Sequence, residues 1–86
     1  MNIQELDSAV AAIGIPARMV ALGGHAQYSW SLEQAEDGIW EVYWLERGDK
    51  NDLERFATEH QACTYLLGRL TYSQILAGLT WGDAGQ

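Results

Sequence analysis

The 86-residue chain has one cysteine, one proline and only five lysines and arginines. One cysteine excludes an intramolecular disulfide, and one thiol with two histidines is too few for a structural zinc site unless carboxylates join. Five basic residues against twelve acidic ones give a net charge of -7, which argues against binding to phosphate backbones and anionic membranes. We therefore expect no nucleic acid, membrane, metal or cofactor, and favour a basic protein as the partner.

Long apolar segments are also missing. No apolar run approaches the about 20 residues that a membrane-spanning helix needs. The first residues lack the basic and apolar segments of a secretory signal, so we expect a cytoplasmic protein. The chain is long enough for one core only. We expect a single domain over residues 1–80 and a flexible tail over residues 81–86.

The sequence predicts a helix at each end of this domain. Asn2 and Glu5 have the spacing of a capping box, and apolar residues recur at helical spacing up to Gly14. Thr58 and Gln61 repeat the capping box before a second apolar stripe. Further along, a glycine either weakens or ends this helix, and residues 72–79 read as one more short helix.

The region between the helices predicts three or four short strands. Residues 18–22 form the first, with a hairpin at the following Gly23–Gly24, and residues 28–33 and 39–47 form the next two. After a turn at residues 48–51, the charged residues 52–56 suit an edge strand. Short turns favour antiparallel neighbours. We therefore expect a two-layer α+β fold, an antiparallel three- to four-stranded meander with the N-terminal and C-terminal helices on one face.

The third strand alternates in a way that assigns its side chains to two faces. Trp40, Val42 and Trp44 fall on one face, which we place against the helices. Tyr43 then points outward, on a sheet face left open to solvent or to a partner. An exposed tyrosine bordered by charged residues is typical of an interface anchor.

Candidate catalytic residues are few and scattered. Cys63 lies on an apolar helical stripe, as a core cysteine does, and His60 reads as a surface or capping residue. His25 follows a glycine pair at a turn tip, without a partner placed by the sequence. The acids from Asp49 onward lack the glycine and the final glutamate of a calcium loop. We expect no enzyme, and either a solvated or a docking role for the acids, nine of which lie between Glu33 and Glu59.

Two stretches carry a resemblance to a known family. These are Trp-Glu-Val-Tyr-Trp-Leu-Glu-Arg-Gly at 40–48, followed by Lys50, Leu53 and Phe56, and Thr-Glu-His-Gln-Ala-Cys-Thr-Tyr-Leu-Leu at 58–67. Together they resemble small bacterial immunity proteins of polymorphic toxin systems, in particular those paired with NAD-glycohydrolase toxins of the tuberculosis necrotizing toxin type. The resemblance covers about a third of the chain. It implies a stoichiometric inhibitor that binds a cognate toxin domain and blocks its active site.

On this reading, the partner-binding residues form a band along the third strand and the turn that follows it. They are Glu41, Tyr43, Glu46, Arg47, Asp49 and Asp52. Glu46 and Arg47 have an alternative role in holding the turn together. Two other functions stay open: a small enzyme that uses His25 or His60 with a carboxylate, and a self-associating regulatory or structural protein that forms a homodimer.

Overall fold

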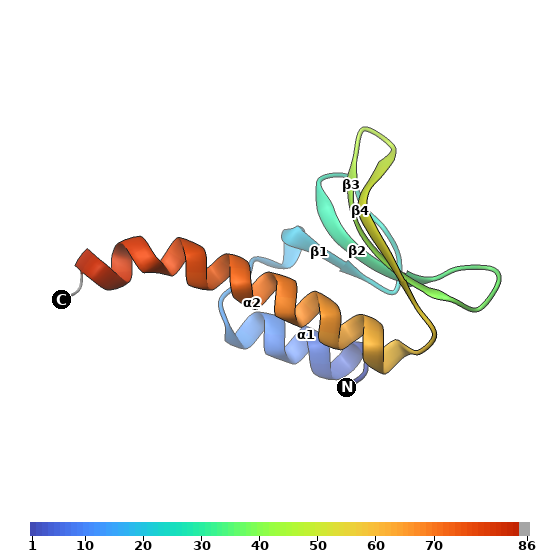
Figure 1. Cartoon of the computed structure of the whole chain (residues 1–86), viewed down its shortest axis with the longest axis horizontal. Helices are drawn as coiled ribbons and strands as arrows, with labels where there is room; N and C mark the ends of the chain where they lie inside the picture. The colour runs from blue at the N-terminus through green and yellow to red at the C-terminus, as the bar shows by residue number, and fades with distance from the viewer. Residues whose placement is uncertain (85–86) are drawn as a thin grey trace.

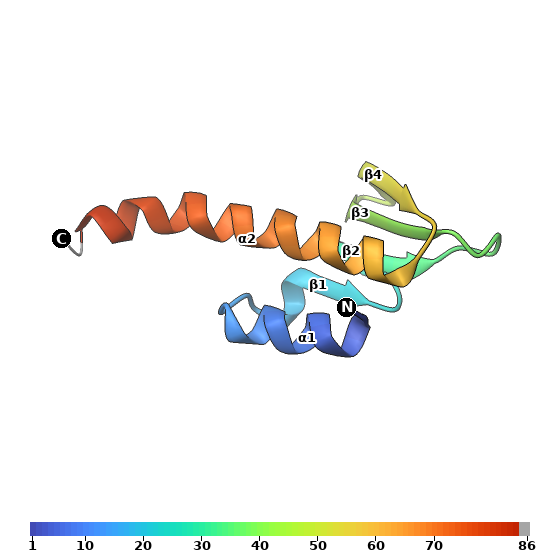
Figure 2. The ribbon, with the colours of Figure 1, turned by 60° about the horizontal axis from the view of Figure 1, so that its bottom comes forward.

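The computed structural model describes the backbone of residues 1–84 and the side chains of residues 1–78. The elements follow in the order α1 (Ile3–Ala12), the short 3-10 helix η1 (Ala17–Met19), β1 (Val20–Leu22), β2 (Ser29–Gln34), β3 (Trp40–Glu46), β4 (Asp49–Phe56) and α2 (Glu59–Ala84). The strands form one sheet in sequence order, and the two helices lie side by side against one face of it (Figures 1 and 2). The expected α+β fold with a helix at each end is confirmed.

Both helices begin at the predicted capping boxes. The Glu5 amide donates to Asn2 Oδ1 at 2.9 Å, and the Asn2 amide donates back to Glu5 Oε1 at 3.1 Å. The Gln61 amide likewise donates to Thr58 Oγ1 at 3.1 Å, and the Thr58 amide to Gln61 Oε1 at 3.3 Å. Each box satisfies amides that have no partner within the first helical turn.

The C-terminal helix is longer than the sequence predicts. It is one element of 26 residues, so the separate short helix over residues 72–79 is wrong. An internal glycine such as Gly68 costs about 1 kcal/mol, but the buried Leu66 and Leu70 pack on either side of it and outweigh that cost. The helix includes residues 81–84, where we expected a tail, and residues 85–86 lie outside the described part of the chain.

A single apolar core joins the helices to the sheet. The fully buried side chains come from α1, from the central strands and from the first half of α2: Leu6, Val10, Leu32, Val42, Ala62, Cys63, Leu66 and Leu70. The half-buried Trp30 and Trp40 pack against this cluster. The assignment of the tryptophan face of β3 to the helices is therefore right.

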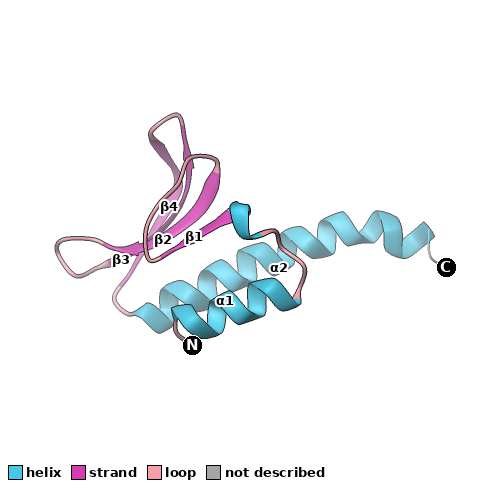
Figure 3. Cartoon of the chain, turned by 180° about the vertical axis from the view of Figure 1, so that it is seen from behind, coloured by secondary structure: helices cyan, strands magenta, loops and turns pink. Residues whose placement is uncertain are grey.

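The first strand pairs differently from the expected hairpin. β1 runs parallel to β2, with Val20 opposite Trp30 and Leu22 opposite Leu32, so the sheet is mixed (Figure 3). A parallel neighbour usually needs a long crossover. Here β1 has only three residues, and the link over residues 23–28 has to return by only about 10 Å along the strand. The expected hairpin at Gly23–Gly24 and the fully antiparallel meander are wrong for this reason.

The turn between β3 and β4 is shorter than the expected turn at residues 48–51. Arg47 and Gly48 alone connect the strands, and both have positive φ, 53° and 80°. This is the requirement of a two-residue type I′ hairpin. β4 therefore starts at Asp49. It lies at the edge of the sheet and carries charged, exposed side chains, which confirms the predicted edge strand.

Candidate functional site

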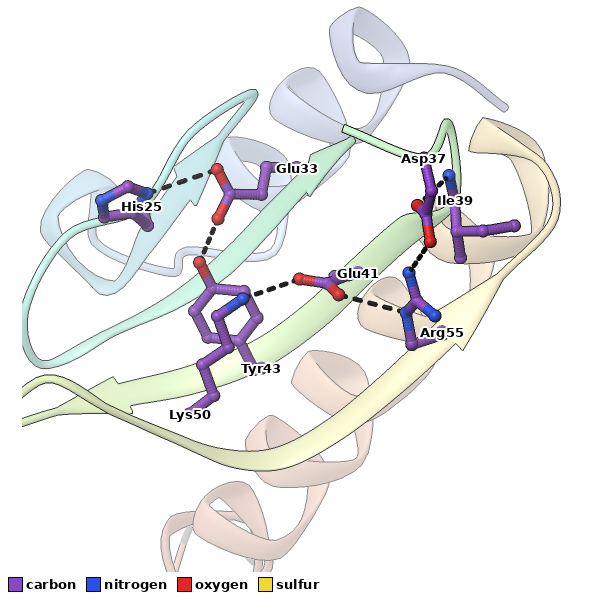
Figure 4. A network of polar contacts seen from close by, with 8 residues as sticks. All are labelled: His25, Glu33, Asp37, Ile39, Glu41, Tyr43, Lys50 and Arg55. Carbon is purple, nitrogen blue, oxygen red and sulfur yellow. Dashed lines mark hydrogen bonds and ion pairs between the residues drawn. The ribbon is translucent and has the colours of Figure 1, made fainter. Parts of the chain in front are cut away.

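A network of polar side chains covers the sheet face that points away from the helices (Figure 4). The strand alternation places Glu33 of β2 and Glu41 and Tyr43 of β3 on this outer face. Glu33 lies directly opposite Glu41 in the antiparallel register. Two like charges in that relation are destabilising. Cationic and hydrogen-bonding groups are therefore needed around them.

The edge strand supplies the cations for Glu41. Lys50 Nζ lies 2.9 Å from Glu41 Oε1, and Arg55 Nε lies 3.1 Å from Glu41 Oε2. Arg55 also contacts Asp37 in the β2–β3 turn at 2.6 Å. The hydrogen bond from Arg55 holds the pKa of Asp37 below its ordinary value. The Glu41 side chain is only 10% exposed, so its charge is neutralised locally and is not free to attract a partner.

Glu33 is held in a different way. Its carboxylate accepts hydrogen bonds from the Tyr43 hydroxyl and, at 3.3 Å, from His25 Nδ1. Burial raises the pKa of Glu33, but the hydrogen bonds from Tyr43 and His25 outweigh burial, so the net pKa is lowered. Burial and the Glu33 hydrogen bond raise the pKa of Tyr43. Glu33 is thus an ionised, half-buried carboxylate, and no lysine or arginine among the described residues forms an ion pair with it.

These groups line a hollow of about 280 Å³ beside the β3–β4 hairpin. Its other walls are Gln27, Leu45 and Gly48, with Lys50 at one side. Lys50 Nζ lies 4.8 Å from the centre of the Tyr43 ring, a cation–π distance that fixes both groups. The hollow is therefore lined by one carboxylate, one imidazole, one ammonium group and amide groups.

Tyr43 is not the exposed anchor that the sequence predicts, since only 1% of it is exposed. The segment over residues 23–28 folds back over the outer face, where His25 and Gln27 line the hollow beside Tyr43, and Lys50 lies over the ring. The Ala26 amide donates to Ser31 Oγ at 3.4 Å, and Gln27 Oε1 accepts from the Gly48 amide at 3.3 Å. The outer face was expected to be open. A six-residue link that returns beside a parallel strand closes part of it.

The six predicted site residues consequently divide into two sets. Glu41 and Tyr43 are buried in the network. Glu46, Arg47 and Asp49 are exposed at the tip of the hairpin, which projects from the body (Figure 1).

Asp52 is also exposed, but it serves the edge of the sheet. It has a φ of 54° where one extra residue in β4 makes a β-bulge opposite β3. Its carboxylate lies 3.6 Å from Arg69 of α2.

The remaining chemical candidates lie apart from this network. Cys63 is buried in the core, and burial raises the pKa of its thiol, which makes it a poor nucleophile. His60 is exposed at the start of α2, beside the amino group of Met1. In the described part of the chain, no three histidine, cysteine or acidic side chains come together as metal ligands. Of the two histidines, His25 contacts a carboxylate, that of Glu33, whereas His60 contacts the Met1 amino group, which lies 4.0 Å from Glu5 Oε1.

The network was missed at the sequence level, although a signal for it exists. Glu33 and Glu41 flank a short turn at equal distances, which places them opposite each other once the hairpin is drawn. Two opposed carboxylates require cations on the next strand. Lys50 and Arg55 supply them, but regular alternation would place these two residues on opposite faces, and only the bulge in β4 brings both to Glu41. The contribution of His25 depends on the return of the 23–28 segment, which nothing in the local sequence specifies.

No family model, no curated protein and no solved structure matches the chain. No helix within the described residues is long and apolar enough to cross a membrane. The resemblance to immunity proteins therefore stays a prediction, which the geometry of the outer face has to support by itself.

Proposed function

We propose that this protein is a cytoplasmic immunity protein without enzymatic activity that binds a basic toxin domain and blocks its active site stoichiometrically. The observation that carries the proposal is the β3–β4 hairpin, whose exposed tip holds two carboxylates, Glu46 and Asp49, on either side of the single cation Arg47, beside the Glu33 hollow. The toxin class, an NAD(P)-degrading glycohydrolase, rests on the sequence resemblance alone.

The hairpin suits the task because its shape is set before binding. A two-residue turn with positive φ at Arg47 and Gly48 needs no ordering step on contact. Preorganised loops lose little conformational entropy when they dock, and more of the contact energy remains as affinity. A projecting acidic hairpin can enter a cleft in a basic domain, and opposite charges accelerate the encounter.

The hollow at the base of the hairpin supplies a second contact. Glu33 is ionised and hydrogen-bonded, and among the described residues Lys50 lies near it in the hollow but no lysine or arginine forms an ion pair with it. An arginine or lysine side chain from the partner completes the pair in a half-buried setting, where a charge-assisted hydrogen bond is stronger than at the open surface. Hairpin and hollow together form one docking face that selects for positive charge.

The test begins with capture of the partner. The tagged protein, used as bait in the source bacterium, is expected to recover a basic toxin domain in near-equal amount. The purified domain is then assayed for NAD hydrolysis as this protein is added. We expect activity to fall linearly to zero at one equivalent. A captured domain that keeps its activity at excess inhibitor, or a bait that recovers no toxin while the toxin is expressed, contradicts the proposal.

A further inference from the structure

The second half of α2 carries large apolar side chains that nothing in the described structure covers. Tyr72 is 62% exposed, Ile75 57% and Leu76 49%. These positions follow the i, i+3, i+4 spacing of one helix face, and Leu79 continues the spacing in the sequence. The helix runs out beyond the sheet here, so the stripe stands away from the body (Figures 1 and 3).

This stripe is not an extension of the core. The buried residues of the first half, Ala62, Leu66 and Leu70, lie on the side of the helix that faces the sheet. At 100° per residue, Ile75 falls on the side of the helix axis opposite that core, while Tyr72 and Leu76 fall about 120° and about 80° from the centre of the core face. The helix therefore changes its apolar side along its length. Because this apolar stripe does not face the core, we expect it to pack against another molecule and not against the body of the same chain.

The projecting segment also has little intrinsic support. A lone stretch of about 12 to 15 residues is marginally helical in water. Thr71 and Gly78 lower its propensity further. Burial of the stripe against a second apolar surface stabilises the helix where its local helix propensity is low.

We infer that this stripe pairs with the same stripe of a second copy, as an antiparallel α2–α2′ contact centred between Ile75 and Leu76. Residues 71–80 contain no Asp, Glu, Lys or Arg, so two copies meet there without desolvating a charge. A partner selected for its basic charge has nothing to recognise on this surface. The inference is thus separate from toxin binding, which uses the opposite end of the molecule.

Charge outside the stripe favours the antiparallel arrangement. Each chain carries a net charge of -7, and eight of its twelve acids lie in the strands or in the turn between β2 and β3. Because α2 projects from one end of a molecule 49 Å long, antiparallel pairing puts the two acidic bodies at opposite ends. That separation exceeds the Debye length of about 8 Å at physiological ionic strength.

Sedimentation equilibrium of the full chain, from micromolar to millimolar concentration, tests the pairing. We expect the mass to rise from 9.6 kDa toward twice that value. Leu76→Glu places two charges at the centre of the contact and is expected to weaken dimerisation at least tenfold. Thr64→Glu adds the same charge to an exposed site nearer the helix start and is expected to leave it unchanged. Far-ultraviolet circular dichroism verifies that both variants are folded.

The distance between two spin labels tests whether the paired helices are antiparallel. A spin label at Gln61→Cys, in a Cys63→Ala background, is expected to lie about 45 Å from its copy in an antiparallel dimer, from the rise of 1.5 Å per residue. A parallel pair brings the labels within about 20 Å. A constant monomer mass, an unaffected dimer in Leu76→Glu, or a short distance between the labels overturns the inference. None of these results bears on toxin binding.

Discussion

The contact between Glu33 and Tyr43 is the residue pair on which the outer face depends. The phenol and carboxylate lie on neighbouring strands, and each shifts the pKa of the other: that of Glu33 is lowered and that of Tyr43 is raised. A carboxylate with a lowered pKa stabilises the fold fully above its ordinary pKa of 4.5. This contribution is lost as the pH falls through the lowered value.

Removal of the Tyr43 hydroxyl tests this pair. We expect Tyr43→Phe to lower the free energy of unfolding at pH 7 by about 1 to 2 kcal/mol, because a hydrogen bond to a charged group is lost while the ring stays in place. The variant should also lose less stability than the wild type on acidification below pH 4.5, since its Glu33 pKa lies nearer the ordinary value. Urea unfolding across this pH range gives both numbers. Tyr28→Phe, at a 55% exposed tyrosine, is the control, and identical acid profiles for the two variants contradict the assignment.

Cys63 provides a second prediction at this scale. Its side chain is fully buried, and burial raises the pKa of the thiol, so the reactive thiolate is scarce. In native buffer at pH 8, a thiol reagent should react with Cys63 only as fast as the protein opens. The labelling rate should therefore rise with urea in parallel with unfolding. Rapid labelling of the folded protein would show that Cys63 is accessible.

At the scale of elements, the β3–β4 turn decides between two roles for Arg47, structure or docking. A non-glycine residue at φ 53° is strained, and asparagine tolerates this conformation better than arginine. We expect Arg47→Asn to raise the free energy of unfolding by about 0.5 kcal/mol, and Gly48→Ala to lower it by about 1 kcal/mol. Thermal unfolding followed by circular dichroism measures both. A loss of stability in Arg47→Asn means that the arginine side chain itself holds the turn.

The start of α2 gives the second prediction for an element. Thr58→Ala removes the acceptor for the Gln61 amide and should cost about 1 kcal/mol of stability. Thr64→Ala, at an exposed position within the same helix, should be neutral or slightly stabilising, because alanine has the higher helix propensity. Urea midpoints separate the two outcomes. Equal midpoints would show that the capping box contributes nothing to the fold.

For the whole molecule, local patterns predicted the elements better than their pairing. Capping boxes and strand alternation are written in neighbouring residues, so the helix starts and the inward face of β3 could be predicted. The direction of β1 depends on how the six residues after Leu22 return, which is a tertiary choice. The burial of Tyr43 depends in part on the same segment, since His25 and Gln27 line the hollow beside it. One unpredicted link therefore accounts for both the mixed sheet and the partly closed outer face.

The residues of the candidate site also divide into those that local sequence predicts and those that depend on strand pairing. Glu46, Arg47 and Asp49 could be placed at an exposed turn from glycine and charge alone, and the structure has them at the hairpin tip. Glu33, Lys50 and Arg55 were missed because their importance arises from cross-strand contacts, which appear only when the register is known. The proposed docking face combines these two groups, with the tip supplied by local sequence and the hollow by the packing of the sheet.

The central claim is that this face binds a basic toxin domain, and the affinity of a charge-reversed hairpin tests it most directly. Isothermal titration of the captured domain with Glu46→Lys/Asp49→Lys should show affinity at least a hundredfold weaker than with the wild type. Glu36→Lys/Glu54→Lys makes the same charge change at exposed acids outside the tip and should weaken binding far less. Equal affinities for the two double variants, with both folded, would contradict the account.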